Sequence, residues 1–153
     1  MLLFFNILAL IATACSEDNS ENNSNATQFA DVDGVKVTGK AGSYHFSVTL
    51  SNPDKGCEQY ADWWEVISES GELLYRRILT HSHVDEQPFT RTGSPVNIQP
   101  DEAIWVRGHM NNTGYGGAVM KGSVSNGFAA TDMPEGFATE LENESPLPDG
   151  CRF

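Results

Sequence analysis

The alternation of apolar and polar residues between positions 44 and 50 constrains the fold of this chain more than any other feature. This segment reads Tyr-His-Phe-Ser-Val-Thr-Leu, so every second side chain is apolar. In an extended strand, successive side chains point to opposite faces of the sheet. The segment therefore predicts a strand with one buried face and one polar face. Turn-forming residues in the segment 51–56 end this strand.

Similar short β-rich runs, separated by turn residues, follow one another along the next part of the chain. They occupy residues 32–37, 44–50, 61–67, 73–81, 95–98, 103–110 and 117–124. No window before residue 130 shows the apolar period of 3.6 residues that an amphipathic helix requires. The sequence therefore predicts an all-β domain, an immunoglobulin- or fibronectin-like β-sandwich of about seven strands, with a small β-barrel as the alternative.

The predicted hairpin over residues 61–81 has apolar side chains on both of its faces. Trp63 and Trp64 are neighbours, so one indole enters the core and the other emerges on the outer face. Arg76 shares a face with leucine and isoleucine side chains, so neither face of the hairpin is purely polar. We therefore expect something to cover the outer face, either the C-terminal tail of the chain or a partner.

The formal charge of −12 is concentrated at the two ends of the chain. Residues 16–28 carry −3 and residues 129–153 carry −5, which leaves −4 for residues 29–128. A nucleic-acid partner is excluded because such proteins need a basic face to neutralise phosphates. We interpret the acidic flanks as a solvated tether and a solvated tail.

The first fourteen residues form an apolar run that is too short to cross a bilayer but suits a signal peptide. The run ends in Ala12-Thr13-Ala14-Cys15, which resembles the lipobox of bacterial lipoproteins. That resemblance implies that Cys15 receives the lipid and becomes the mature N-terminus. Ala12 and Ala14 also suit an ordinary signal peptidase, and that cleavage falls at the same bond. The Asn-, Ser- and acid-rich stretch after Cys15 predicts an extended spacer.

The remaining two cysteines, Cys57 and Cys151, predict a disulfide in an oxidising compartment. The bridge closes a loop of about 94 residues, which stabilises the fold by about 4–5 kcal/mol on the chain-entropy model. We divide the chain into a signal peptide at 1–14, a lipidated cysteine with its tether at 15–28, a β-sandwich at 29–128, and an irregular tail at 129–153 pinned by the disulfide.

The densest polar cluster of the sequence lies at residues 81–87 and contains two histidines. If strand geometry continues, His81 and His83 lie on one face, and His109 from another strand becomes a further imidazole ligand. Such a set suits an open Zn or Cu site. The alternative is a structural role in which the histidines hydrogen-bond the following loop. We expect no cofactor, with the metal as the alternative.

Aromatic side chains offer a second kind of candidate site. An outward-facing Trp63, together with Trp105 or Tyr115, forms a stacking platform of the kind that binds carbohydrate. Core packing is the alternative role for each of these side chains. The sequence contains no nucleophile elbow and no phosphate-binding loop, so we assign no catalytic residue.

The segments YADWWEV at 60–66, HSHV at 81–84, EQPFTR at 86–91 and GYGG at 114–117 resemble an uncharacterised family of exported bacterial proteins. The resemblance spans about residues 44–124 and implies no activity, but it directs attention to Arg91 and to the turn at 114–117. We therefore predict a lipid-anchored binding module of the cell envelope, in the periplasm or at the outer membrane, with a protein or carbohydrate ligand. The alternative is a metal-binding protein or metal-dependent enzyme.

Overall fold

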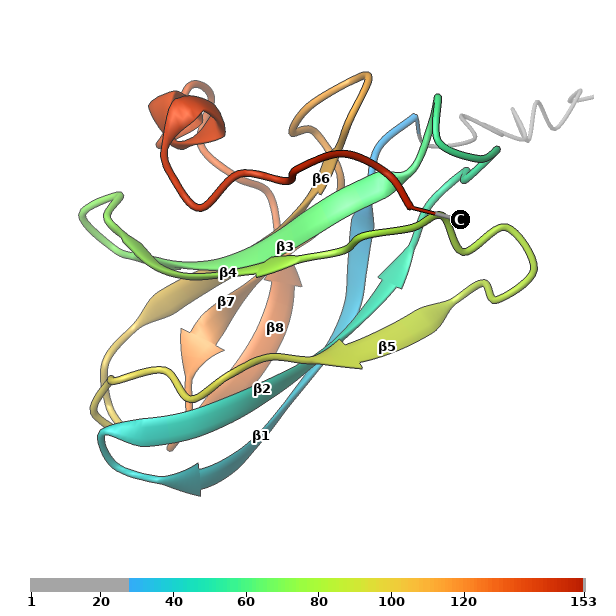
Figure 1. The fold of residues 1–153 in the computed structure, drawn as a ribbon. Coiled ribbons are helices and arrows are strands. Elements are labelled where there is room, and N and C mark those ends of the chain that lie inside the picture. Colours follow the sequence, from blue (N-terminus) through green and yellow to red (C-terminus); the bar gives the residue numbers. More distant parts are fainter. Residues whose placement is uncertain (1–27, 153) are drawn as a thin grey trace, which may run out of the picture.

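The computed structural model describes residues 28–152 and contains two antiparallel β-sheets packed face to face (Figure 1). The first sheet has the order β1-β2-β5, with β1 at Asp31–Lys40, β2 at Ser43–Ser51 and β5 at Phe89–Thr92. The second has the order β4-β3-β6-β7-β8. Its strands are Leu73–Ile78, Ala61–Ser68, Ile104–Met110, Val119–Ser123 and Gly127–Thr131. The two open sheets confirm the predicted β-sandwich.

The core lies between the sheets and follows the expected alternation. Along β2, buried residues alternate with partly exposed ones, and Phe46, Val48 and Leu50 have no exposed surface. Trp64 and Val66 of β3 meet them from the opposite sheet. The period of two in the sequence therefore identifies the core face of β2 correctly.

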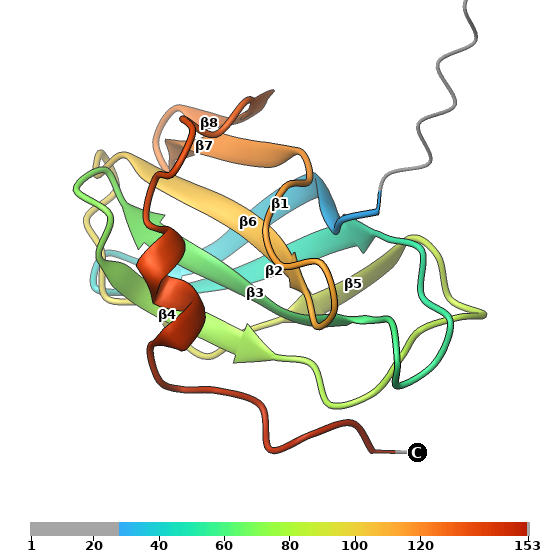
Figure 2. The ribbon, with the colours of Figure 1, turned by 90° about the horizontal axis from the view of Figure 1, so that it is seen from above.

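Strands β3 and β6 depart from this alternation because they are buried on both faces. All seven residues of β6 are buried, as are the first seven of β3. Their outer face packs against the C-terminal segment, where Leu141 and Ala138 join Ile67 and Trp105 in a second apolar cluster. This segment contains the short 3-10 helix η1 at Thr139–Asn143 and crosses β3 and β4 before it reaches the C-terminal end (Figure 2). The structure thus places the tail on the face that the sequence predicted to be covered.

The structure differs from the expected strands in several places. The run at 95–98 contributes only an isolated bridge between Tyr44 and Val96, whereas β5 and β8 are strands that the pattern did not predict. Because β8 continues to Thr131, the sandwich ends three residues later than expected. The signal peptide, Cys15 and the tether up to residue 27 lie outside the described residues.

Candidate functional site

A buried carboxylate lies at the centre of the outer face of the five-stranded sheet. Glu65 of β3 is paired in register with Arg76 of β4 and with Arg107 of β6. Arg76 donates from Nε and Nη2 to Oε2 of Glu65 at 2.8 and 2.6 Å, and Arg107 donates from Nε to Oε1 at 2.8 Å. Glu65 has no exposed surface. One carboxylate therefore holds two guanidinium groups in a nearly water-free position, with its hydrogen bonds satisfied.

The same two arginines hold the C-terminal segment against the sheet. Arg107 donates from Nη2 to the Ala138 carbonyl at 2.6 Å and from Nη1 to the Phe137 carbonyl at 3.1 Å. Arg76 donates from Nη2 to the Leu141 carbonyl at 2.6 Å, and its Nη1 donates to carbonyls farther along the tail. The tail carbonyls thus accept the donors that Glu65 leaves free, so the ionic cluster and the tail stabilise each other.

His109 makes a third connection between the sheet and the tail. Its ring stacks on Trp63 with the centroids 3.6 Å apart. Its Nδ1 lies 2.6 Å from Asp62, and its Nε2 lies 3.2 Å from Glu142 of η1. Burial raises the pKa of Asp62, and the hydrogen bond from His109 partly offsets that rise. His109 therefore bridges a buried carboxylate and an exposed one.

A cleft of about 640 Å³ opens beside this cluster, between the turn at 115–118 and the segment at 132–139. Its lining includes Arg107 and Tyr115, and the guanidinium carbon of Arg107 lies 3.5 Å from the centre of the Tyr115 ring. Burial and the nearby charge of Glu65 raise the pKa of Tyr115, so its phenol stays neutral. The volume falls within the range of pockets that bind small ligands or single peptide side chains.

The lining of the cleft is acidic around an apolar wall. Asp31, Asp132 and Glu135 supply the carboxylates, and Met133, Pro134 and Phe137 form the apolar wall. Among the described residues that line the cleft, Arg107 is the one cation, and it is already paired with Glu65. The cleft therefore combines negative charge with an apolar surface.

The turn at 114–117 shapes this cleft through close backbone contacts. A Cβ atom on Gly117 would lie 2.1 Å from the Ala30 carbonyl oxygen, so only glycine fits there. The neighbouring Gly116 faces the ring of Phe29, which would be 2.8 Å from an added Cβ. The GYGG segment thus lets the start of β1 approach β7, where the Val32 amide donates to the Ala118 carbonyl at 2.9 Å.

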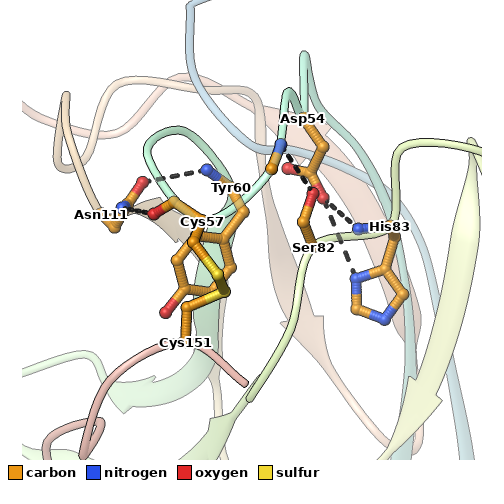
Figure 3. Close-up of a disulfide and its surroundings, with 8 residues drawn as sticks. Asp54, Cys57, Tyr60, Ser82, His83, Asn111 and Cys151 are labelled. Carbon is orange, nitrogen blue, oxygen red and sulfur yellow. Dashed lines mark hydrogen bonds and ion pairs between the residues drawn. A yellow bond between two sulfur atoms is a disulfide. The ribbon is translucent and has the colours of Figure 1, made fainter. Parts of the chain in front are cut away.

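The histidines of the 81–87 segment lie in a different environment. His83 is 4% exposed and stacks on Phe89 with the ring centroids 3.8 Å apart, and the ring of His81 is 4.6 Å away. Burial and the nearby Arg91 lower the pKa of His83 to about 4. Nδ1 of His83 lies 3.9 Å from a carboxylate oxygen of Asp54, beyond hydrogen-bond distance (Figure 3), and neither ring nitrogen has a hydrogen-bond partner within the described residues. At neutral pH His83 is therefore an uncharged, stacked core side chain.

Asp54 fixes this segment close to the disulfide (Figure 3). Its carboxylate accepts from the amide of His83 at 2.6 Å and from the amide of Ala61 at 3.0 Å. The predicted bridge between Cys57 and Cys151 is present, with the two Cα atoms 5.5 Å apart. The amide of Arg152 next donates to the Thr80 carbonyl at 2.6 Å. The disulfide therefore anchors the far end of the tail beside the 81–87 segment.

The structure separates the candidate residues of the sequence into three places. Tyr115 lines the cleft, whereas Trp63 and Trp105 are only 3% and 7% exposed beneath the tail, so neither indole is available for stacking on a sugar. Arg91 forms an exposed ion pair with Glu86 at 2.7 Å. Trp63 and Trp105 therefore belong to the sheet face that the C-terminal tail covers, and they do not form a surface platform.

The three histidines predicted as metal ligands do not form one group. His81 and His83 lie together in the connection between β4 and β5. His109 lies on the outer face of the five-stranded sheet, where its two ring nitrogens contact the carboxylates of Asp62 and Glu142. Within residues 28–152, no group of three or more His, Cys, Asp or Glu side chains has an arrangement suited to a metal ion. A zinc or copper site based on His81 and His83 stays a prediction.

Sequence reasoning did not find the ionic cluster or the cleft. A glutamate within the apolar run of β3 signals a buried carboxylate, but the identity of its partners depends on strand register. Arg107 is 42 positions from Glu65, and Asp31 and Glu135 line one cleft only because β1 and the tail converge. Within the sequence, only the glycines of the 114–117 turn indicated the close backbone approach between this turn and the start of β1.

Comparison with known proteins gives one informative similarity. The chain is 37% identical over 109 residues to a protein of Halomicrobium mukohataei named "Putative lipoprotein", and the match covers 71% of this chain and 54% of the relative. The chain thus spans about half the length of that relative. No protein-family model and no solved structure matches the chain. No helix within residues 28–152 is both long and apolar enough to span a bilayer.

Proposed function

We propose that this protein is exported, is anchored to a membrane of the cell envelope through a lipid on Cys15, and acts there as a binding module. Two observations support the anchor. The first is the apolar run that ends in Ala12-Thr13-Ala14-Cys15, and the second is the similarity to a protein named as a lipoprotein. The acidic spacer after Cys15 and the disulfide of the domain agree with an extracytoplasmic location.

The cleft beside Tyr115 is the observation that supports a binding function. It is bounded by β1, the turn at 115–118 and the segment at 132–139, so its walls come from three distant parts of the sequence. The segment at 132–139 is fixed to β8 at one end and to Arg107 at the other. We propose a peptide segment of a partner protein as the ligand, because acidic groups beside an apolar wall suit cationic and apolar side chains.

Anchoring is tested by cell fractionation of the full chain and of the Cys15→Ser variant. We expect the wild type in the membrane fraction and the variant in the soluble fraction of the envelope, with the mature wild type heavier by the mass of its lipid. Ser16→Ala is the matched control and should behave like the wild type. Equal fractionation of the wild type and Cys15→Ser would contradict the anchor.

Binding is tested by chemical-shift mapping on the mature chain carrying Cys15→Ser. Short lysine-containing peptides and neutral oligosaccharides are added as separate mixtures. We expect the peptides to shift the resonances of residues 115–119 and 132–139, with no comparable change on the outer face of β2. Shifts confined to other regions, or shifts caused only by oligosaccharides, would contradict the proposed peptide site.

A further inference from the structure

The last strand of the five-stranded sheet differs from every other edge strand of the sandwich. The edges are β1 and β5 in one sheet and β4 and β8 in the other. Charged side chains lie on β1, β4 and β5, for example Lys36, Arg77 and Arg91. By contrast, β8 has the uncharged sequence Gly-Phe-Ala-Ala-Thr. Natural proteins usually protect an edge strand with charges, prolines or a covering segment.

The outer backbone groups of β8 are also free of partners in the described part of the chain. On one side, β8 pairs with β7 from Gly127 to Thr131. No hydrogen bond among residues 28–152 involves its other side. Four of its five residues are exposed, and Phe128 is the one that packs against the core. Figure 2 shows β8 at the outer margin of the sheet. The strand is therefore open to addition of a further strand.

The acidic cleft begins where β8 ends. Thr131 is the last residue of β8, Asp132 follows it directly, and Glu135 comes three residues later. Both carboxylates line the cleft together with Asp31. In antiparallel pairing, the N-terminal end of an added strand lies next to the C-terminal end of the strand that receives it. An added strand would therefore place the residues that precede it beside these carboxylates.

We propose that β8 receives an extended segment of a partner protein, which pairs antiparallel with it and places basic residues at its N-terminal end in the cleft. This inference depends on the proposed function, because it specifies how the cleft recognises a peptide. Charge complementarity selects the occupant: the cleft carries three carboxylates, and its arginine is already paired. A second copy of this chain, at −12, fits the same edge poorly because like charges repel.

The test uses the mature chain carrying Cys15→Ser and a synthetic peptide of two lysines followed by alternating valine and threonine. Two further peptides carry N-methyl groups on alternate backbone amides, one in each of the two possible phases. Only one edge of a strand faces β8, so one methylated peptide should bind at least about tenfold more weakly and the other should bind nearly as well as the parent. Amide exchange at residues 127–131 should slow only when a binding peptide is present.

The charge requirement is tested with Asp132→Asn/Glu135→Gln, and Glu140→Gln/Asp149→Asn is the control with the same change of net charge outside the cleft lining. We expect the first pair to weaken the lysine peptide several-fold more than the control pair does, and we expect a peptide with two glutamates in place of the lysines not to bind.

Three outcomes would overturn the inference. If both methylated peptides bind equally well and still change the chemical shifts of the cleft residues, strand pairing with β8 is contradicted, whereas the proposed peptide site is not. No binding of any of these peptides would remove the inference, and the mapping experiment above would then decide the proposed function alone. Dimers that form through β8 without peptide, and that Ala129→Lys disrupts, would assign the edge to a second copy.

Discussion

At the scale of single residues, the stability of this domain depends on one carboxylate that serves two arginines. Because Glu65 has no exposed surface, its removal would leave the guanidinium groups of Arg76 and Arg107 buried and without a counter-charge. Breaking a buried pair costs more than the intact pair contributes, since the remaining charge cannot be solvated. The charge of Glu65 is therefore a structural requirement of the outer face.

We expect Glu65→Gln to lower the free energy of unfolding by about 3–5 kcal/mol, as measured by urea denaturation at neutral pH. The control is Glu86→Gln, which removes the exposed pair with Arg91 and should change the stability little. If both variants lost a similar free energy of unfolding, burial of the ionic cluster would not determine its contribution to stability.

His83 gives the stability a dependence on pH. Its pKa is lowered to about 4 in the folded state, against an ordinary value of 6.5, so below pH 6.5 the unfolded chain binds a proton that the folded chain excludes. The stability that neutral His83 provides is therefore lost as the pH falls from about 6.5 towards 4. Burial raises the pKa values of Asp54 and Asp62, which makes them respond in the opposite direction.

We expect His83→Phe to keep about 2 kcal/mol more of its neutral-pH stability at pH 4.5 than the wild type does. The measurement compares urea denaturation of both proteins at pH 7 and pH 4.5. The exposed, non-titrating neighbour Val84 provides the control, and Val84→Phe should follow the wild type at both pH values. A wild type and a His83→Phe variant with the same acid dependence would contradict this assignment.

At the scale of elements, the alternating pattern predicted β2 and the opposite faces of Trp63 and Trp64, because those depend only on the period of a strand. It did not predict β8, whose glycine and alanines have little strand preference and which forms through its hairpin with β7. It also missed β5, which has four residues and follows Pro88. The cleft could not be predicted, because its walls meet only through tertiary packing.

The tail is an element held by two independent anchors, and they can be separated by experiment. We expect Cys57→Ser/Cys151→Ser to lower the free energy of unfolding by about 4 kcal/mol, since the bridge closes a loop of 94 residues. In native-state hydrogen exchange, the amide of Arg152, which donates to the Thr80 carbonyl, should lose protection in this variant. The amides of Leu141 and Glu144 should keep theirs, because Arg76 and Arg107 still hold that part of the tail on the sheet. Loss of protection along the entire tail would show that the disulfide alone holds it.

At the scale of the whole molecule, the charge distribution and the fold lead to one arrangement. The domain between residues 29 and 128 carries only −4 of the total −12, so most of the acidity belongs to the flanks. Part of the C-terminal acidity nevertheless has a specific location, because Asp132 and Glu135 line the cleft and Glu142 contacts His109. The acidic tail is therefore a folded layer of the molecule, which composition alone could not distinguish from a solvated extension.

The attachment of the segment at 132–139 at both of its ends affects the energetics of ligand binding in the cleft. The segment at 132–139 continues directly from β8 and is gripped by Arg107 at Phe137 and Ala138. Both ends of the segment are thus held before any ligand arrives, so association gives up less conformational entropy than ordering a free loop would. A small contact area can then suffice for selective association, and the encounter rate is governed by diffusion and charge and not by a slow rearrangement of the protein.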